Sequence, residues 1–229
     1  MPIPIKSLPE HEFSEIPFIA IAIRRPNPYV HTGLLYRDDA AEIRLSHLAW
    51  HCRFYGSDIP SEVDLWIEPH FNDIVQEQLA AFLIHRAEEQ ARGDIPYSII
   101  RQGKCFDETG KFISGEIGEG LTCATYILGA FEALEIPIVQ LNTWRTGREE
   151  DLVWFEAILQ LLVRAQPPAS QQHIEVQRAA LPNVVRYRPE EVAAAFSLFR
   201  DVSLRFEEVE PPSLEILQFL RDPAAPAAQ

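Results

Sequence analysis

The chain has 229 residues, a length that predicts one domain with a helical extension. Its composition of 47% hydrophobic, 10% aromatic and 24% charged residues excludes a disordered, collagenous or low-complexity chain. The formal net charge of −14 makes nucleic acid and anionic membrane surfaces poor partners, because the surface field repels phosphate groups.

The sequence shows no segment that directs it out of the cytoplasm. Its start lacks the basic residues, the continuous apolar stretch and the cleavage site of a signal peptide. No run of about eighteen uncharged apolar residues occurs that could span a bilayer. No phosphate-binding or dinucleotide-binding glycine motif is present either. We therefore expect a cytoplasmic protein without a membrane span and without a cofactor.

The first part of the chain predicts strands. Alternating or β-branched apolar residues recur in segments that turn residues separate, as at 25–29 and at Asp38 and Asp39, so an antiparallel meander is expected. The expected strands are 17–24, 30–37, 41–54 and 62–67.

Helices and shorter elements follow. Asp73 and Gln76 form a predicted capping box for an amphipathic helix that runs to Gly93. A short strand over 95–101 and a hairpin that turns at 108–110 are expected next. Thr122 is then predicted to cap a helix that ends before Pro137, so Cys123 lies at a helix N-terminus.

The C-terminal part predicts mainly helices. A capping box at Thr146 and Glu149 would open a helix that runs to about Ala165, and the acidic trio that precedes the proline pair at 211 and 212 would form a solvated linker. Further helices are expected over 170–181, 189–199 and 213–220.

Strands that precede helices predict an α+β fold, in which a small sheet packs against the helix that begins at Cys123. We expect a core over 1–136, an acidic helical extension over 137–222 and a disordered tail over 223–229.

Cys123 is the candidate nucleophile. The positive end of a helix lowers a cysteine pKa, and its free amide groups can bind a developing oxyanion. A lone cysteine on an apolar helical stripe is also a common buried packing residue, so the chemistry requires a base.

His31 and His47 are the candidate partners of this cysteine. His31, Gly33 and Leu35 share one face of their predicted strand, and a turn at Asp38 and Asp39 would bring His47 beside His31. One imidazole could then act as the base and the other could orient it. Gly33 is expected to leave room above the sheet for the helix start or a substrate.

The segments His31-Thr-Gly33, Ser46-His47-Leu48 and Thr122-Cys123-Ala124 carry a resemblance over residues 18–134. In order and approximate spacing they resemble the circularly permuted papain-like thiol hydrolases of the NlpC type, which include YiiX-like and lecithin:retinol acyltransferase-like enzymes. The resemblance implies a cysteine-dependent hydrolase of a peptide, isopeptide-like or other acyl bond. In it, Cys123 would be the nucleophile, His31 the base and His47 the orienting residue.

Two alternatives stay open. His47, His51 and Cys52 form an HxxxHC cluster that could bind zinc, although a strand would point Cys52 away from both histidines. The papain-like shell could also be a non-catalytic module that recognises a protein partner through its acidic helical part.

Overall fold

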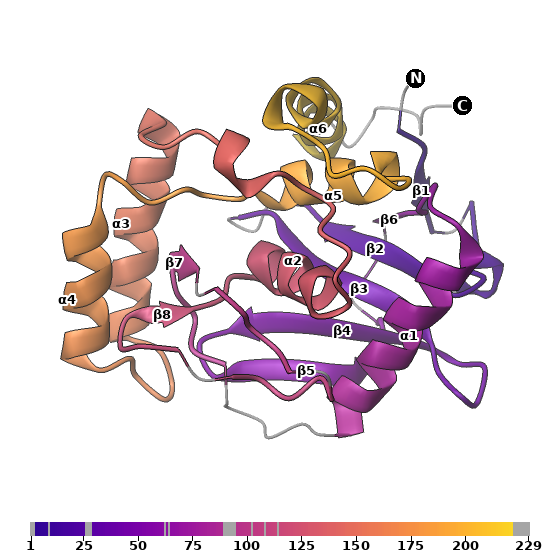
Figure 1. Ribbon diagram of the computed structural model, residues 1–229, viewed down its shortest axis with the longest axis horizontal. Coiled ribbons are helices and arrows are strands. Elements are labelled where there is room, and N and C mark those ends of the chain that lie inside the picture. The colour runs from indigo at the N-terminus through magenta and orange to yellow at the C-terminus, as the bar shows by residue number, and fades with distance from the viewer. Residues whose placement is uncertain are drawn as a thin grey trace.

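The structure is a computed structural model. It describes residues 3–8, 10–25, 29–61, 63, 65–88, 95–101, 103–107, 109–113 and 115–221. These residues form the expected α+β fold, in which an antiparallel sheet carries helices on one side (Figure 1). None of the described helices is long and apolar enough to cross a bilayer. The expected tail at 223–229, and parts of the expected features at 25–29, 93 and 108–110, lie outside the described residues.

Within the described residues, the main sheet has six strands in the order β1-β6-β2-β3-β4-β5. Its strands are β1 (Ile5–Ser7), β2 (Ile19–Arg24), β3 (His31–Arg37), β4 (Ile43–Trp50), β5 (Arg53–Asp58) and β6 (Leu65–Ile67). The meander from β2 to β5 is confirmed, but β6 lies between β1 and β2 and so joins the sheet at its other end. The single strand expected over 41–54 is wrong, because the chain turns at His51 and Cys52, where Cys52 has a φ of 53°.

A two-stranded parallel pair precedes the cysteine. β7 (Ile100–Arg101) pairs with β8 (Glu119–Gly120), and Tyr97 forms an isolated bridge with Leu121. In the segment between β7 and β8, the expected hairpin is present as an antiparallel bridge between Phe106 and Phe112.

The six helices of the described residues are α1 (Asp73–Glu88), α2 (Cys123–Ala133), α3 (Glu149–Val163), α4 (Gln171–Ala180), α5 (Pro189–Leu198) and α6 (Phe206–Arg221). The expected caps at Thr122 and the first-turn position of Pro189 are confirmed. The capping box expected at Asp73 and Gln76 has the wrong cap residue. Asn72 caps α1 instead, since its side chain accepts a hydrogen bond from the Val75 amide at 3.1 Å. The box at Thr146 and Glu149 is also wrong, because Arg148 precedes the first turn of α3.

The start of α6 corrects the expected linker. Glu207, Glu208 and Glu210 lie in this helix, which also contains the proline pair. Phe206 and Val209 are buried on it, and the Phe206 ring contacts Trp144 at a centroid distance of 5.4 Å. This burial, which the local acidic composition does not reveal, favours the helix over a solvated segment.

One hydrophobic core joins the strands to the C-terminal helices. The main buried cluster extends from Ile3 to Leu220 and includes residues of α1, α2, α3, α5 and α6. Figure 1 shows α2 and α5 over the sheet, α6 beside α5, and α3 and α4 side by side at one end. The helices after residue 137 therefore pack into the same core as the sheet. A smaller cluster, which includes Ala22, Leu35, Leu45 and Val63, covers the other sheet face.

Candidate active site

The structure brings His31 and His47 together. They lie on the neighbouring strands β3 and β4, and His31 Nε2 is 2.9 Å from His47 Nδ1. The His47 ring stacks on Tyr55 at 5.6 Å, and its Nε2 is 3.7 Å from Asp58 Oδ2. These contacts hold the second imidazole on the side away from His31, as an orienting residue requires.

Gly33 makes the histidine pair possible. A Cβ added at Gly33 would lie 2.8 Å from the Cβ of His47 and 3.0 Å from the backbone oxygen of Ser46. The expectation that Gly33 leaves room for the helix start or a substrate is therefore wrong: the space is occupied by β4 and His47.

We expect Gly33→Ala to lower the free energy of unfolding by roughly 1–3 kcal/mol, because the added methyl group overpacks a filled space. Gly103→Ala is the matched control, since a Cβ at Gly103 meets no atom within 4 Å. Chemical denaturation of the two variants measures the difference. Equal stabilities would contradict this account of Gly33.

Cys123 is the first residue of α2. Thr122 caps the helix by accepting a hydrogen bond from the Thr125 amide at 3.1 Å. The thiol is buried, and burial raises its pKa to about 11, although interaction with the backbone amides of Thr32 and Ala124 lowers it. The expected lowering of the cysteine pKa is therefore wrong, because desolvation outweighs the amide groups of the helix start.

His31 is also shifted by its surroundings. Burial, followed by the charges of His47 and Arg24, lowers its pKa to about 3. At neutral pH the thiol and the imidazole are therefore both uncharged.

His31 and Cys123 line one cavity of about 420 Å³. The helix of Cys123 packs on the sheet face to which Ser46 points, since Tyr126 on α2 contacts the Ser46 hydroxyl at 2.6 Å. By strand alternation His31 and His47 project from the other face, which corrects the expected packing of the helix over the histidines. His31 is the first residue of β3 and also lines a smaller hollow on that other face.

Among the described residues, neither imidazole forms a hydrogen bond with the Cys123 sulfur. The sulfur instead lies by the backbone amide of Thr32, the residue that follows His31. His31 and His47 are thus paired with each other, and the Cys123 thiol lies next to the start of β3, the strand that carries His31.

His51 makes a backbone contact and does not join His47 in the zinc cluster considered above. The His51 Nδ1 atom accepts a hydrogen bond from the Tyr97 amide at 3.1 Å, while His47 pairs with His31. No group of three His, Cys, Asp or Glu side chains in the described ranges is placed to hold a metal ion. The structure therefore does not bring His47, His51 and Cys52 together as ligands.

A second histidine binds the backbone carbonyl group of Tyr97. His173 Nδ1 accepts from the Gly118 amide at 3.2 Å, so its Nε2–H donates to the Tyr97 carbonyl oxygen, 3.0 Å away. The His51 and His173 rings lie 5.6 Å apart. Since Tyr97 lines the cavity beside Cys123, the two imidazoles fix part of the cavity wall.

Several cavity residues were not predicted as site residues. Tyr97, Trp154, Arg164 and Arg186 come from segments far from the cysteine in sequence. No local motif marks them, because the fold alone brings these segments together. Neither the models of known protein families, nor the curated proteins, nor the solved structures give a match to this chain.

Proposed function

We propose that this chain is a cysteine-dependent hydrolase of an amide or related acyl bond, with Cys123 as nucleophile, His31 as base and His47 as orienting residue. The observation that carries the proposal is the His31–His47 hydrogen bond beside a cavity that the helix-starting cysteine also lines. The proposal includes a permuted papain-like arrangement of the sheet and α2, a peptide or protein substrate and a cytoplasmic location.

The histidine pair can supply a directed base. When His31 Nε2–H donates to His47 Nδ1, His31 Nδ1 keeps a lone pair that can accept the thiol proton. The His47 Nε2–H then faces the Asp58 carboxylate, which favours the charge that develops on the pair. This tautomer is assigned from the contacts, which fit it at both ring nitrogens of His47.

The proposed chemical steps use these residues in turn. The Cys123 sulfur attacks the substrate carbonyl carbon while its proton passes to His31, and the amide groups at the start of α2 stabilise the oxyanion. The oxyanion then collapses: the bond from the carbonyl carbon to the leaving group breaks, His31 returns the proton to that group, and an acyl-Cys123 thioester remains. Water hydrolyses this acyl-enzyme with His31 again as base.

The shifted pKa values influence the first step. Because the thiol has a pKa of about 11 and the imidazole one of about 3, a preformed thiolate–imidazolium pair is disfavoured. Proton transfer therefore accompanies sulfur attack instead of preceding it. The strand position of His31 directs it to the other sheet face, but it is the first residue of β3 and lines the Cys123 cavity. The proposal therefore requires the thiol and the imidazole to approach each other around the end of β3 when substrate binds.

An acyl-enzyme test addresses the proposal directly. On incubation with p-nitrophenyl acetate, we expect an acetyl group on Cys123, detected by peptide mapping and mass spectrometry. Cys52 and Cys105 serve as internal references, and burial also raises the pKa of the Cys105 thiol to about 11. Since Cys105 and Cys123 share this raised pKa, preferential acetylation of Cys123 is the result expected if His31 acts as its base.

Cys123→Ser is the control for acetylation of the Cys123 thiol. In this variant we expect neither the acetyl group at residue 123 nor the fast release of nitrophenol. Acetylation of Cys123 no faster than that of Cys105 would contradict the hydrolase. It would favour the alternative of a non-catalytic module that binds a protein partner through the acidic helical part.

A further inference from the structure

The charged side chains of the described residues that line the Cys123 cavity are cationic. Its walls are mainly aromatic and aliphatic. The described lining also includes two permanently charged side chains, those of Arg164 and Arg186. Among the residues that the structure describes, no Asp or Glu belongs to this lining, although the chain as a whole carries a net charge of −14. The described lining of the cavity therefore differs in the sign of its charge from the chain as a whole, as a binding site for an anion would.

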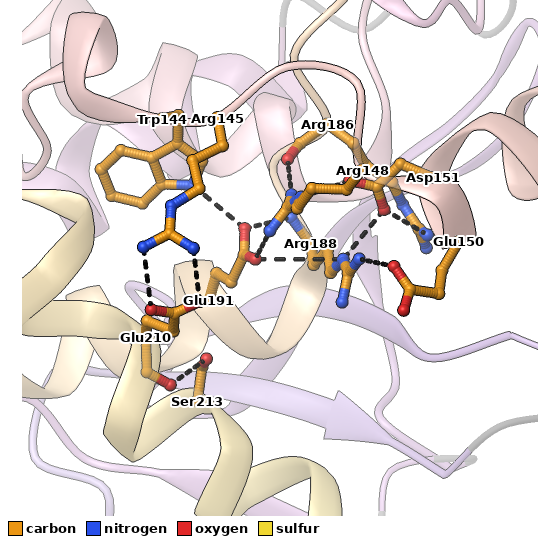
Figure 2. Close-up of polar contacts among 10 residues, drawn as sticks. All are labelled: Trp144, Arg145, Arg148, Glu150, Asp151, Arg186, Arg188, Glu191, Glu210 and Ser213. Atoms are coloured by element: carbon orange, nitrogen blue, oxygen red, sulfur yellow. Dashed lines mark hydrogen bonds and ion pairs between the residues drawn. The ribbon is translucent and has the colours of Figure 1, made fainter.

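Arg186 is held rigidly at the cavity. Its Nη1 atom lies 3.1 Å from Asp151 Oδ1, and its guanidinium carbon lies 3.9 Å from the centroid of the Trp154 ring (Figure 2 shows the ion pair). Stacking and the ion pair together restrict the side chain, so it loses little further freedom when it binds a ligand.

Arg186 belongs to an ion-pair cluster in which Arg148 and Arg188 also pair with Glu191 and Glu150, and its own Nε–H has no acceptor among the described residues. Asp151 is shared with two other arginines, since its carboxylate also pairs with Arg148 Nε at 2.5 Å and Arg188 Nε at 2.9 Å. The Nε–H of Arg186 is buried. A buried donor without an acceptor is costly, and a ligand oxygen nearby would lower that cost.

Arg164 provides a second cation on the cavity wall. It follows the last turn of α3, and it is exposed. Within the described ranges, its guanidinium group has neither a hydrogen bond nor an ion pair. Its charge is therefore available to a ligand in the cavity.

We propose that this cavity binds a ligand with an apolar or aromatic body and one carboxylate, which pairs with Arg186 and Arg164. A planar carboxylate matches the fork of a guanidinium group, and the ring-lined walls suit the apolar body. The volume of about 420 Å³ is in the range of small-molecule sites. A multiply charged phosphate fits less well, because the mainly apolar walls cannot replace its hydration.

The proposal deepens the hydrolase function and rests on it for one step. Arg186 lies within electrostatic reach of the Cys123 thiol, so a carboxylate bound there would place a neighbouring acyl bond near the sulfur. The substrate class would then be an amide with a free carboxylate close to the scissile bond, as in an N-acylated amino acid or the C-terminal end of a short peptide.

Binding can be measured without reaction. In Cys123→Ser protein, isothermal titration calorimetry would compare N-acetyl-L-phenylalanine with its neutral analogue N-acetyl-L-phenylalaninamide. We expect the carboxylate to bind about ten- to a hundredfold more tightly, since hydrogen bonds to charged groups have that effect. The preference should decrease as KCl concentration rises, because one of the two cations is exposed.

Arg164→Gln is the informative variant, because this exposed side chain can be changed without removing a partner of Asp151. It should reduce the preference for the carboxylate several-fold, whereas Arg200→Gln, an exposed arginine at a separate hollow, should leave it unchanged. Equal affinities for the two ligands, no binding of either, or displacement by inorganic phosphate as effective as by acetate would each overturn the proposal.

The two proposals fail in different ways. A carboxylate preference in a wild-type protein that forms no acetyl-Cys123 would overturn the hydrolase and leave the anion site. Acetylation of Cys123 without a carboxylate preference would overturn the anion site alone.

Discussion

His31→Ala is expected to slow acetylation of Cys123 by p-nitrophenyl acetate by about 10²–10⁴-fold, the usual contribution of a general base. The thiol has a pKa of about 11, so almost no thiolate is present at neutral pH to react without a base. The nitrophenol burst in stopped-flow absorbance measures the rate, and circular dichroism checks folding. A His31→Ala protein that reacts as fast as wild type would remove His31 from the mechanism.

The His47 variants separate orientation from proton transfer. His47→Ala should slow the reaction less than His31→Ala, because the base remains and loses only the hydrogen bond that directs it. His47→Gln should retain more activity than His47→Ala, since an amide can still accept from His31 Nε2. If His47→Ala were inactive while His31→Ala reacted normally, the roles of the two histidines would be reversed.

The second large effect concerns stability. Asp151→Asn is expected to lower the free energy of unfolding by about 3–5 kcal/mol, because it removes the charged partner of a buried ion-pair network. The Asp151 carboxylate is buried and contacts three guanidinium groups, those of Arg148, Arg186 and Arg188 (Figure 2). An asparagine amide keeps the shape and leaves these cations without that charge.

Thermal unfolding followed by circular dichroism measures this effect. For a chain of this size the loss corresponds to a decrease in Tm of about 6–20 °C. Glu150→Gln is the matched control: it changes the neighbouring carboxylate, which is 80% exposed and lies 3.5 Å from Arg188 Nη2. The control should change stability by less than about 0.5 kcal/mol. Equal losses in the two variants would contradict the importance of burial.

Local patterns determined several parts of the fold correctly. The period-two alternation around His31 and His47 placed both on one sheet face, and a Thr in front of an apolar helical stripe located the start of α2 at Cys123. These features depend on residues that are neighbours in the chain or across one short turn. Pattern and capping chemistry are therefore sufficient to predict them.

Segments whose structure depends on distant burial were predicted incorrectly. The acidic residues at 207–210 look like a solvated linker, but burial of Phe206 and Val209 makes the segment helical. The turn at His51 and Cys52 interrupts what composition alone presents as one strand. In both cases contacts with distant residues outweigh the weak local preference.

The sequence by itself thus determined the α+β class, the antiparallel meander that precedes the helices and the pairing of His31 with His47. Only the tertiary structure decided that α2 packs on the opposite face from that pair, and that the helix-starting thiol has a raised pKa. It also decided that Arg164 and Arg186 line the same cavity as Cys123. The physical reason is that burial and electrostatic environment depend on segments far apart in the chain, whereas a helix cap or a strand pair is specified by its neighbours.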